Sequence, residues 1–178
     1  MFAVAAAFPA GARPASADNE LAQRYAPVVR LVRQDEPCHH GEPFQPTDVN
    51  LVLRNPDVAL RGPWDRSNII KVAPTAADLA GGLFGYHLDF PGHAVTPGCV
   101  YDEWSHRLNE GHPSRAYARL APDPAYPRQI ALQYWFFYVF NNFNDKHEGD
   151  WEMIQLDFDA PTAQQALGTK PALVGHPS

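Results

Sequence analysis

Residues 129–140 read QIALQYWFFYVF, a nearly unbroken apolar stretch. Successive side chains of a strand point to opposite faces. In this stretch the alternate set from Ile130 to Phe140 is apolar throughout, and so is the other set, from Ala131 to Val139, apart from Gln133. A strand that is apolar on both faces is covered on both sides, so these residues predict the central strand of a sheet.

The flanking segments extend this β pattern. Residues 151–159 predict a second strand, and the short polar connection at 141–149 favours antiparallel pairing. Residues 28–32 and 86–90 are further strand candidates, and residues 114–120 suit an edge strand before a proline-rich turn. The 18 prolines and 12 glycines favour short extended segments over a helical bundle. We therefore predict a mainly β fold, an antiparallel β-sandwich with short helices.

Helices are expected to be few and short. Asp18 can cap a helix over residues 19–25, and the sequence from Thr75 to Asp78 predicts a capping box over one helical turn, closed by Gly81 and Gly82. Residues 49–53 suit either a helix or a strand. We expect one domain over residues 18–178. Little sequence follows the central strands, so the C-terminal part of the sandwich is expected to be missing.

The first 17 residues, MFAVAAAFPAGARPASA, resemble an export signal. Ala15-Ser16-Ala17 is an A-x-A type cleavage site, but the basic start is absent and the apolar run is short. We interpret residues 1–17 as a truncated signal peptide and expect a secreted, extracellular protein. The alternative is a disordered arm rich in alanine and proline. No later stretch is long and apolar enough to predict a transmembrane segment.

The chain has two cysteines, Cys38 and Cys99. In an exported protein an even pair predicts a disulfide, here closing a loop of about 60 residues. Two free buried thiols are the alternative. A zinc site at Cys38, His39 and His40 is disfavoured because no second Cys or His stands at zinc spacing.

Charge and motifs exclude several functions. The formal net charge is −6 and no basic stripe occurs, so nucleic acid is not an expected partner. The Gly-x-Ser-x-Gly motif of serine hydrolases is absent. We therefore assign no catalytic residue and favour binding over catalysis.

The densest group of potential ligands is the sequence HEGDWE at residues 147–152. Strand alternation puts Asp150 and Glu152 on one face, at the rim of the core. Two ionised carboxylates are costly there unless a divalent cation, an arginine or a shared proton lies between them. A metal-free network in which His147 bonds to Asp150 is one alternative. A carboxylate pair about 7 Å apart, as in glycoside hydrolysis, is another.

The other residues of this segment have expected roles as well. Gly149 is expected to supply a bend or a positive φ that brings His147 back over the carboxylates. Glu148 is expected to be solvated, and Trp151 to pack against a second sheet. Trp64 and Trp104, in loop-like segments, are candidates for exposed recognition residues.

Several stretches resemble a known family. They are residues 25–29 (YAPVV), 134–138 (YWFFY), Asn141-Asn142 and above all 146–152 (KHEGDWE). Together they are similar to the proteins related to vacuolar protein sorting-associated protein sixty-two, whose molecular function is poorly defined. That family's second half would add further strands and a His-containing segment.

The spacing His-x-x-Asp-Trp-Glu also resembles the necrosis- and ethylene-inducing peptide-like proteins, which are secreted β-sandwich toxins. These toxins bind a divalent cation through this motif and recognise sphingolipid head groups. The resemblance implies that His147, Asp150 and Glu152 ligate or orient a metal. The toxins have a second His here, where this chain has Glu148 and Gly149. The completing oxygens would come from Asn141, Asn142 and Asp145.

The combined expectation is a secreted binding domain with a divalent-cation site at one end of the sandwich. Carboxylate and amide oxygens suit Ca²⁺, Mg²⁺ or Mn²⁺. An open coordination position would bind a polar head group of a glycan or lipid. The alternatives are a metal- or carboxylate-dependent hydrolase of a glycan or lipid, and a structural domain in which the motif is a metal-free brace.

Overall fold

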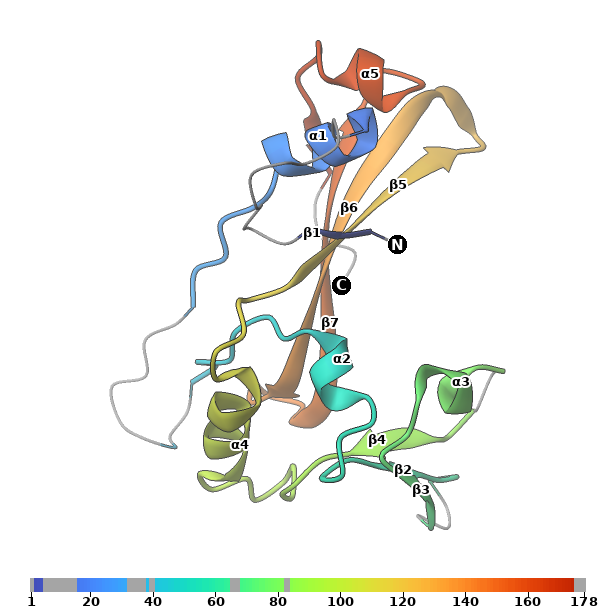
Figure 1. Ribbon diagram of the computed structural model, residues 1–178. Helices are drawn as coiled ribbons and strands as arrows, with labels where there is room; N and C mark the ends of the chain where they lie inside the picture. The colour runs from blue at the N-terminus through green and yellow to red at the C-terminus, as the bar shows by residue number, and fades with distance from the viewer. Residues whose placement is uncertain are drawn as a thin grey trace. The chain divides into compact units, whose positions relative to one another are not determined.

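The computed structural model describes residues 2–4, 16–31, 38, 41–64, 68–81 and 84–174. The described residues belong to two compact units, and Figure 1 labels the elements of both. The first unit draws on residues 1–30, 115–136 and 151–178, and the second on residues 31–114 and 137–150. The strands β6 (Tyr126–Asn141) and β7 (His147–Phe158) contribute to both units. The single domain expected from the sequence stays a prediction.

The larger sheet contains five strands in the order β1-β5-β6-β7-β8. Besides β6 and β7 it contains β1 (Phe2–Val4), β5 (Ala116–Asp123) and β8 (Ala172–Val174). The pairs β1–β5, β5–β6 and β7–β8 are antiparallel, with Ala118 opposite Tyr134 in the β5–β6 register. The mainly β, antiparallel prediction is confirmed. The sandwich packing itself stays a prediction.

The apolar stretch that predicted a central strand is the interior of β6, which has a neighbour on each side. Leu132 and Tyr134 are fully buried, and the Tyr134 hydroxyl donates to the Ala22 carbonyl at 2.6 Å. Burial raises the pKa of Tyr134 above its ordinary range. The hydroxyl therefore ties the sheet to helix α1 (Ala17–Arg24) while staying protonated.

The N-terminal segments differ in part from expectation. Helix α1 begins before Asn19 because Ser16, rather than Asp18, is its cap; the Asn19 amide donates to Ser16 Oγ at 3.3 Å. Strand β1 lies inside the predicted signal peptide and pairs with β5, so β5 is not an edge strand along those three residues. Cleavage after Ala17 would remove β1 and leave β5 as an edge strand. Export stays a prediction.

The second unit contains a three-stranded antiparallel sheet in the order β3-β2-β4. Its strands are β2 (Ala59–Arg61), β3 (Ile69–Val72) and β4 (His87–Asp89). Arg61 Nε and Asp89 Oδ2 form an ion pair at 2.6 Å across β2 and β4. The segment left open between helix and strand is helix α2 (Val49–Val52), capped by Asp48, whose Oδ1 accepts from the Asn50 amide at 3.0 Å.

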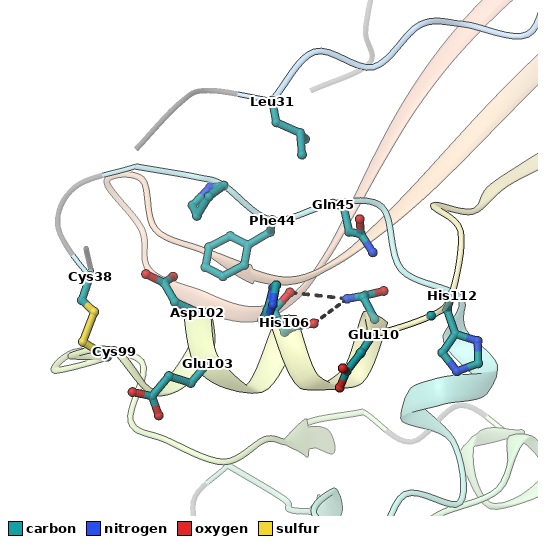
Figure 2. Close-up of a pocket in the computed structure, with 14 residues that line it drawn as sticks. Leu31, Cys38, Phe44, Gln45, Cys99, Asp102, Glu103, His106, Glu110 and His112 are labelled. Carbon is teal, nitrogen blue, oxygen red and sulfur yellow. Dashed lines mark hydrogen bonds between the residues drawn. A yellow bond between two sulfur atoms is a disulfide. The ribbon is translucent and has the colours of Figure 1, made fainter. Parts of the chain in front are cut away.

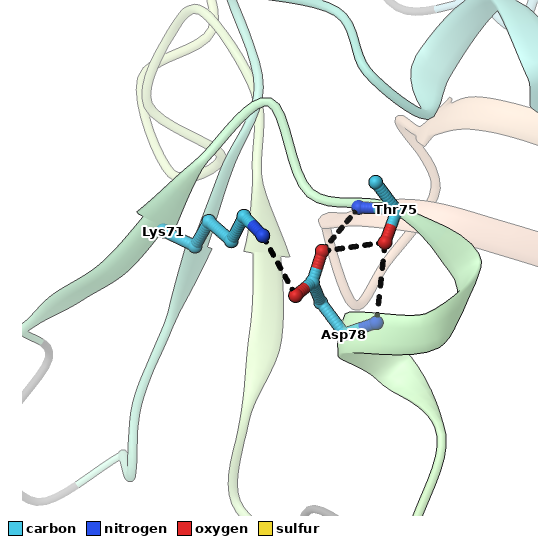
Figure 3. A network of polar contacts seen from close by, with 3 residues as sticks. All are labelled: Lys71, Thr75 and Asp78. Carbon is cyan, nitrogen blue, oxygen red and sulfur yellow. Dashed lines mark hydrogen bonds and ion pairs between the residues drawn. The ribbon is translucent and has the colours of Figure 1, made fainter.

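The predicted capping box is confirmed in α3 (Ala76–Leu79), and Figure 3 shows its contacts. The Asp78 amide donates to Thr75 Oγ1, and Asp78 Oδ2 accepts from the Thr75 amide at 2.8 Å. Lys71 Nζ donates to the other carboxylate oxygen at 2.8 Å. The Lys71 bond first, and then the Thr75 bonds, hold the pKa of Asp78 well below its usual range. The turn ends at Ala80, before the expected Gly81.

Helix α4 (Val100–Asn109) was not predicted, and it corrects one expected role. Its Trp104 is only 2% exposed and its ring lies 5.0 Å from the ring of Phe90, so Trp104 is a core residue rather than an exposed recognition residue. Tyr101 of the same helix stacks on Phe140 with ring centroids 4.0 Å apart. Trp64 is 69% exposed, as expected.

The predicted disulfide between Cys38 and Cys99 is confirmed. The predicted strand at residues 28–32 is wrong over residues 28–31, which are exposed and form no strand of the described sheets. Val32 lies outside the described residues, as do His39 and His40.

Candidate functional site

The candidate site lies where β6 ends and β7 begins, within the second unit. Gly149 has φ +72°, which confirms the predicted positive φ. This left-handed residue interrupts the regular alternation of side chains along β7. As a result His147 and Asp150, three residues apart, approach each other, with Nε2 and Oδ1 separated by 3.5 Å.

Replacing Gly149 by alanine is expected to lower the free energy of unfolding by about 1–2 kcal/mol, because an L side chain resists positive φ. Space is not the obstacle, since an added Cβ would lie 3.6 Å from the nearest Phe137 ring atom. Chemical denaturation measures the change. Gly168→Ala is the matched control, because Gly168 does not have a positive φ and an added Cβ would meet ordinary contacts. Equal effects of the two substitutions would contradict the argument.

His147 and Asp150 are each held by a neighbouring group. His147 Nδ1 lies 2.6 Å from the Asp145 carbonyl oxygen, so this nitrogen carries the proton and donates. Asn141 Nδ2 donates to Asp150 Oδ2 at 3.2 Å, and Asn141 Oδ1 accepts from the Phe143 amide at 2.9 Å. In a neutral imidazole, Nε2 is then left as a lone-pair donor beside the Asp150 carboxylate.

The pKa of His147 is raised above 6.5. Partial burial acts to lower it, but the hydrogen bond to the Asp145 carbonyl and the nearby Asp150 carboxylate together outweigh that effect. The protonated imidazole is therefore favoured to a higher pH than in an unfolded chain. In the folded protein His147 and Asp150 can act as an ion pair at low pH and as two lone-pair donors at high pH.

The six predicted ligands have different positions. Asn141, His147 and Asp150 are brought together. Asp145 contributes its backbone carbonyl. The remaining two predicted ligands are Asn142 and Glu152. Asn142 Nδ2 donates to the Gly41 carbonyl at 3.3 Å, and its buried Oδ1 accepts no hydrogen bond from the described residues. Glu152 belongs to the first unit, where it is exposed.

Two side chains of the described site could act as donors to a metal ion. Among the described residues, no three or more His, Cys, Asp and Glu side chains form a group that could hold a metal ion. His147 Nε2 and Asp150 Oδ1 supply two donors, and their 3.5 Å separation is near the spacing of adjacent ligands about 2.2 Å from one ion. Asn141, with both amide atoms engaged, positions Asp150 rather than ligating.

Glu148 corrects a prediction, because it is not solvated. Its Oε1 accepts from the Tyr101 hydroxyl, and its Oε2 accepts from the Phe90 amide at 3.0 Å. Burial raises the pKa of Glu148, although both hydrogen bonds act to lower it. Burial, and then the bond to Glu148, raise the pKa of Tyr101 as well. A half-buried carboxyl group thus links β7 to α4 and to the end of β4.

This link was not predicted, because α4 was not predicted. Tyr101, Trp104 and Leu108 have the spacing of one helical face, which would have indicated an amphipathic helix.

Trp151 packs beside aromatic rings of its own sheet, and the expected contact with a second sheet stays a prediction. Its ring centroid lies 5.9 Å from that of Tyr117 and 6.5 Å from that of Trp135. Tyr117 and Trp135 are partners in the β5–β6 register. Trp151 of β7 therefore contacts one ring from β5 and one from β6, and its own side chain is partly exposed.

No protein-family model, curated protein or solved structure matches this chain. The resemblance to the two families rests on the quoted residues and stays a prediction. No helix among the described residues could cross a membrane.

Proposed function

We propose that the protein is a secreted binding domain in which His147 and Asp150 hold a divalent cation that binds a polar head group. The observation that carries this proposal is the 3.5 Å separation of Nε2 and Oδ1, together with the Asp145 carbonyl that keeps the proton on Nδ1. A backbone carbonyl is one of the common partners of the second ring nitrogen of a metal-ligating histidine.

The small number of protein donors supports a ligand-completed site. Mg²⁺ and Mn²⁺ bind six oxygen or nitrogen atoms, and Mg²⁺ commonly takes only one or two carboxylates from a protein. Two protein ligands leave the remaining positions to water or to oxygens of a phosphate or sugar. The side chain of His147 is 44% exposed and that of Asp150 is 19% exposed, so such a ligand could reach the ion.

A structural brace is the second candidate, and Glu148 is the observation that favours it. The middle carboxylate of the motif is already engaged by Tyr101 and by the Phe90 amide without a metal. On this view His147 and Asp150 form an ion pair that secures the start of β7, and the motif stabilises the second unit.

Thermal unfolding of the full chain with Mn²⁺ or with EDTA separates the two candidates. At a Mn²⁺ concentration ten times the Kd, binding would add about 1.4 kcal/mol to the free energy of unfolding. The midpoint should rise in the wild type and not in Asp150→Asn or His147→Gln. Asp159→Asn, an exposed carboxylate after β7, is the matched control and should respond like the wild type.

The pH dependence has opposite signs in the two cases. Mn²⁺ requires a neutral imidazole, so its effect should grow as pH rises through the raised pKa of His147. An ion pair alone contributes fully below the unfolded pKa of about 6.5 and is lost as pH rises through the higher folded value. Two results together would reject the cation and support the structural brace. The first is the absence of a Mn²⁺ response at about pH 8, and the second is a free energy of unfolding that decreases as pH rises through the pKa of His147.

A further inference from the structure

A pocket lies beside α4 in the second unit, as Figure 2 shows. The carboxylates among its lining residues belong to α4 or directly follow it, and a cluster on one helix does not define a ligand. The larger sheet carries more varied chemistry in its first-unit part. One face there combines an exposed aromatic ring with hydrogen-bonded amide side chains.

The two faces of this sheet differ in burial. Tyr134 is fully buried and bonds to α1, and the Phe158 ring lies 5.2 Å from the ring of Tyr25, which follows α1. That face is therefore covered. Strand alternation places Gln133 and Trp135 on the opposite face, and both of these side chains are only half-buried. The opposite face is thus accessible in part.

The amides on this accessible face have fixed orientations. Gln133 Nε2 donates to Gln155 Oε1 at 2.7 Å, and Gln155 Nε2 donates to Asp157 Oδ1 at 2.9 Å. Each amide nitrogen has a second N–H, and the Gln133 and Asp157 side chains each have a further oxygen. Closely spaced donors and acceptors of this kind suit hydroxyl groups, which both donate and accept.

The aromatic ring is that of Trp151, which is 42% exposed. Its contacts with Tyr117 and Trp135 place it on the same face as Gln133 and restrict its movement. A restricted aromatic ring loses little conformational entropy when a ligand stacks on it. Trp151 precedes Gln155 by four residues of β7, about 13 Å. A ligand that contacts both residues must therefore be longer than one sugar ring.

The charges beside the amides balance. Arg119 lies opposite Gln133 in the β5–β6 register and so shares its face, where Asp157 supplies one negative charge. A surface with one charge of each sign favours a neutral ligand over a polyanion or a polycation. Polar side chains in the middle of a sheet face also suit a hydrated ligand better than an apolar protein core.

We propose that this face binds a neutral β-linked glycan. Sugar rings with equatorial hydroxyls have C–H groups on their flat faces and hydroxyls around the rim. One ring would stack on Trp151, and hydroxyls of a neighbouring ring would bond to Gln133 and Gln155. The proposed cation site of His147 and Asp150 takes no part in this binding.

Isothermal titration calorimetry of the full chain in EDTA tests the proposal with cellopentaose and glucose. We expect saturable binding of cellopentaose, at least about tenfold tighter than that of glucose, because only the longer probe can reach both Trp151 and Gln155. EDTA makes this result independent of the cation proposal. Binding that occurs only with added Mn²⁺ would assign the glycan to the cation site and overturn the inference.

Substitutions locate the binding surface. Trp151→Ala should weaken cellopentaose binding at least about tenfold, whereas Trp151→Phe, which keeps an aromatic ring, should stay within about threefold. Gln133→Ala/Gln155→Ala should weaken it about fivefold. Trp64→Ala is the matched control, because Trp64 is an exposed tryptophan of the second unit, and its effect should be less than about twofold.

Several results would overturn the proposal. They are the absence of saturable binding, equal affinity for the two probes, and equal losses in Trp151→Ala and Trp64→Ala. Sedimentation velocity adds one more: self-association of the wild type that Trp151→Ala abolishes would assign this face to a second copy of the chain. Unchanged thermal midpoints show that the variants fold, and Trp151→Phe carries the comparison if the alanine variant is destabilised.

Discussion

Replacing Glu148 by alanine is expected to lower the free energy of unfolding by about 3 kcal/mol. The substitution leaves the Tyr101 hydroxyl and the Phe90 amide without their acceptor. Both residues are buried, so water cannot readily replace the lost carboxylate. The cost is the desolvation of two donors together with the loss of contacts around the side chain.

Glu148→Gln should behave differently at neutral pH. Glutamine has nearly the same shape; its carbonyl can accept from the Phe90 amide, and its amide can donate to the Tyr101 oxygen. The folded pKa of Glu148 is raised above 4.5, so ionisation of this carboxyl group opposes folding. Its stabilising contribution is full below the unfolded pKa and is lost as pH rises through the folded value. The glutamine variant should lack that loss and equal or exceed the wild type at pH 7.

Urea unfolding of the wild type and both variants between about pH 4 and pH 8 measures these differences. The free energy of unfolding of the wild type, minus that of the glutamine variant, should decrease as pH rises. A glutamine variant as unstable as the alanine variant at every pH would show that the negative charge itself, and not the two hydrogen bonds, stabilises this contact.

The contrast between β6 and α4 shows what the sequence could predict. In β6 both faces are apolar over a long run, and no other element fits that pattern. In α4 the apolar residues Tyr101 and Trp104 are separated by charged side chains, and the helix begins beside a disulfide with no side-chain cap. This weaker local signal does not predict a helix.

In the candidate site, too, one contact could be predicted from the sequence and others could not. The contact of His147 with Asp150 depends on residues three apart and on the positive φ of Gly149, so local reasoning reached it. The contacts of Glu148 are long-range: Tyr101 lies 47 positions before it in the chain and Phe90 lies 58 positions before it. Only the packing of α4 and the segment after β4 brings them together, and no local pattern encodes that packing.

Replacing Cys38 and Cys99 together by serine is expected to lower the free energy of unfolding by about 4 kcal/mol. The disulfide joins residues 61 positions apart, so it removes many conformations from the unfolded chain. For a chain of this length the loss corresponds to a fall of about 8–16 °C in the thermal midpoint. The enclosed segment contains α2, β2, β3, α3 and β4, so the effect should fall mainly on the second unit.

Dithiothreitol provides the control for the disulfide prediction. Reduction should lower the wild-type midpoint about as much as the double substitution does, because both free the same loop. It should leave the double serine variant unchanged, since that variant has no disulfide to reduce. If the double serine variant unfolds at the wild-type midpoint, the packing of α4 and β2–β4 already restricts residues 38–99 in the unfolded ensemble. The crosslink would then constrain a loop that is compact without it.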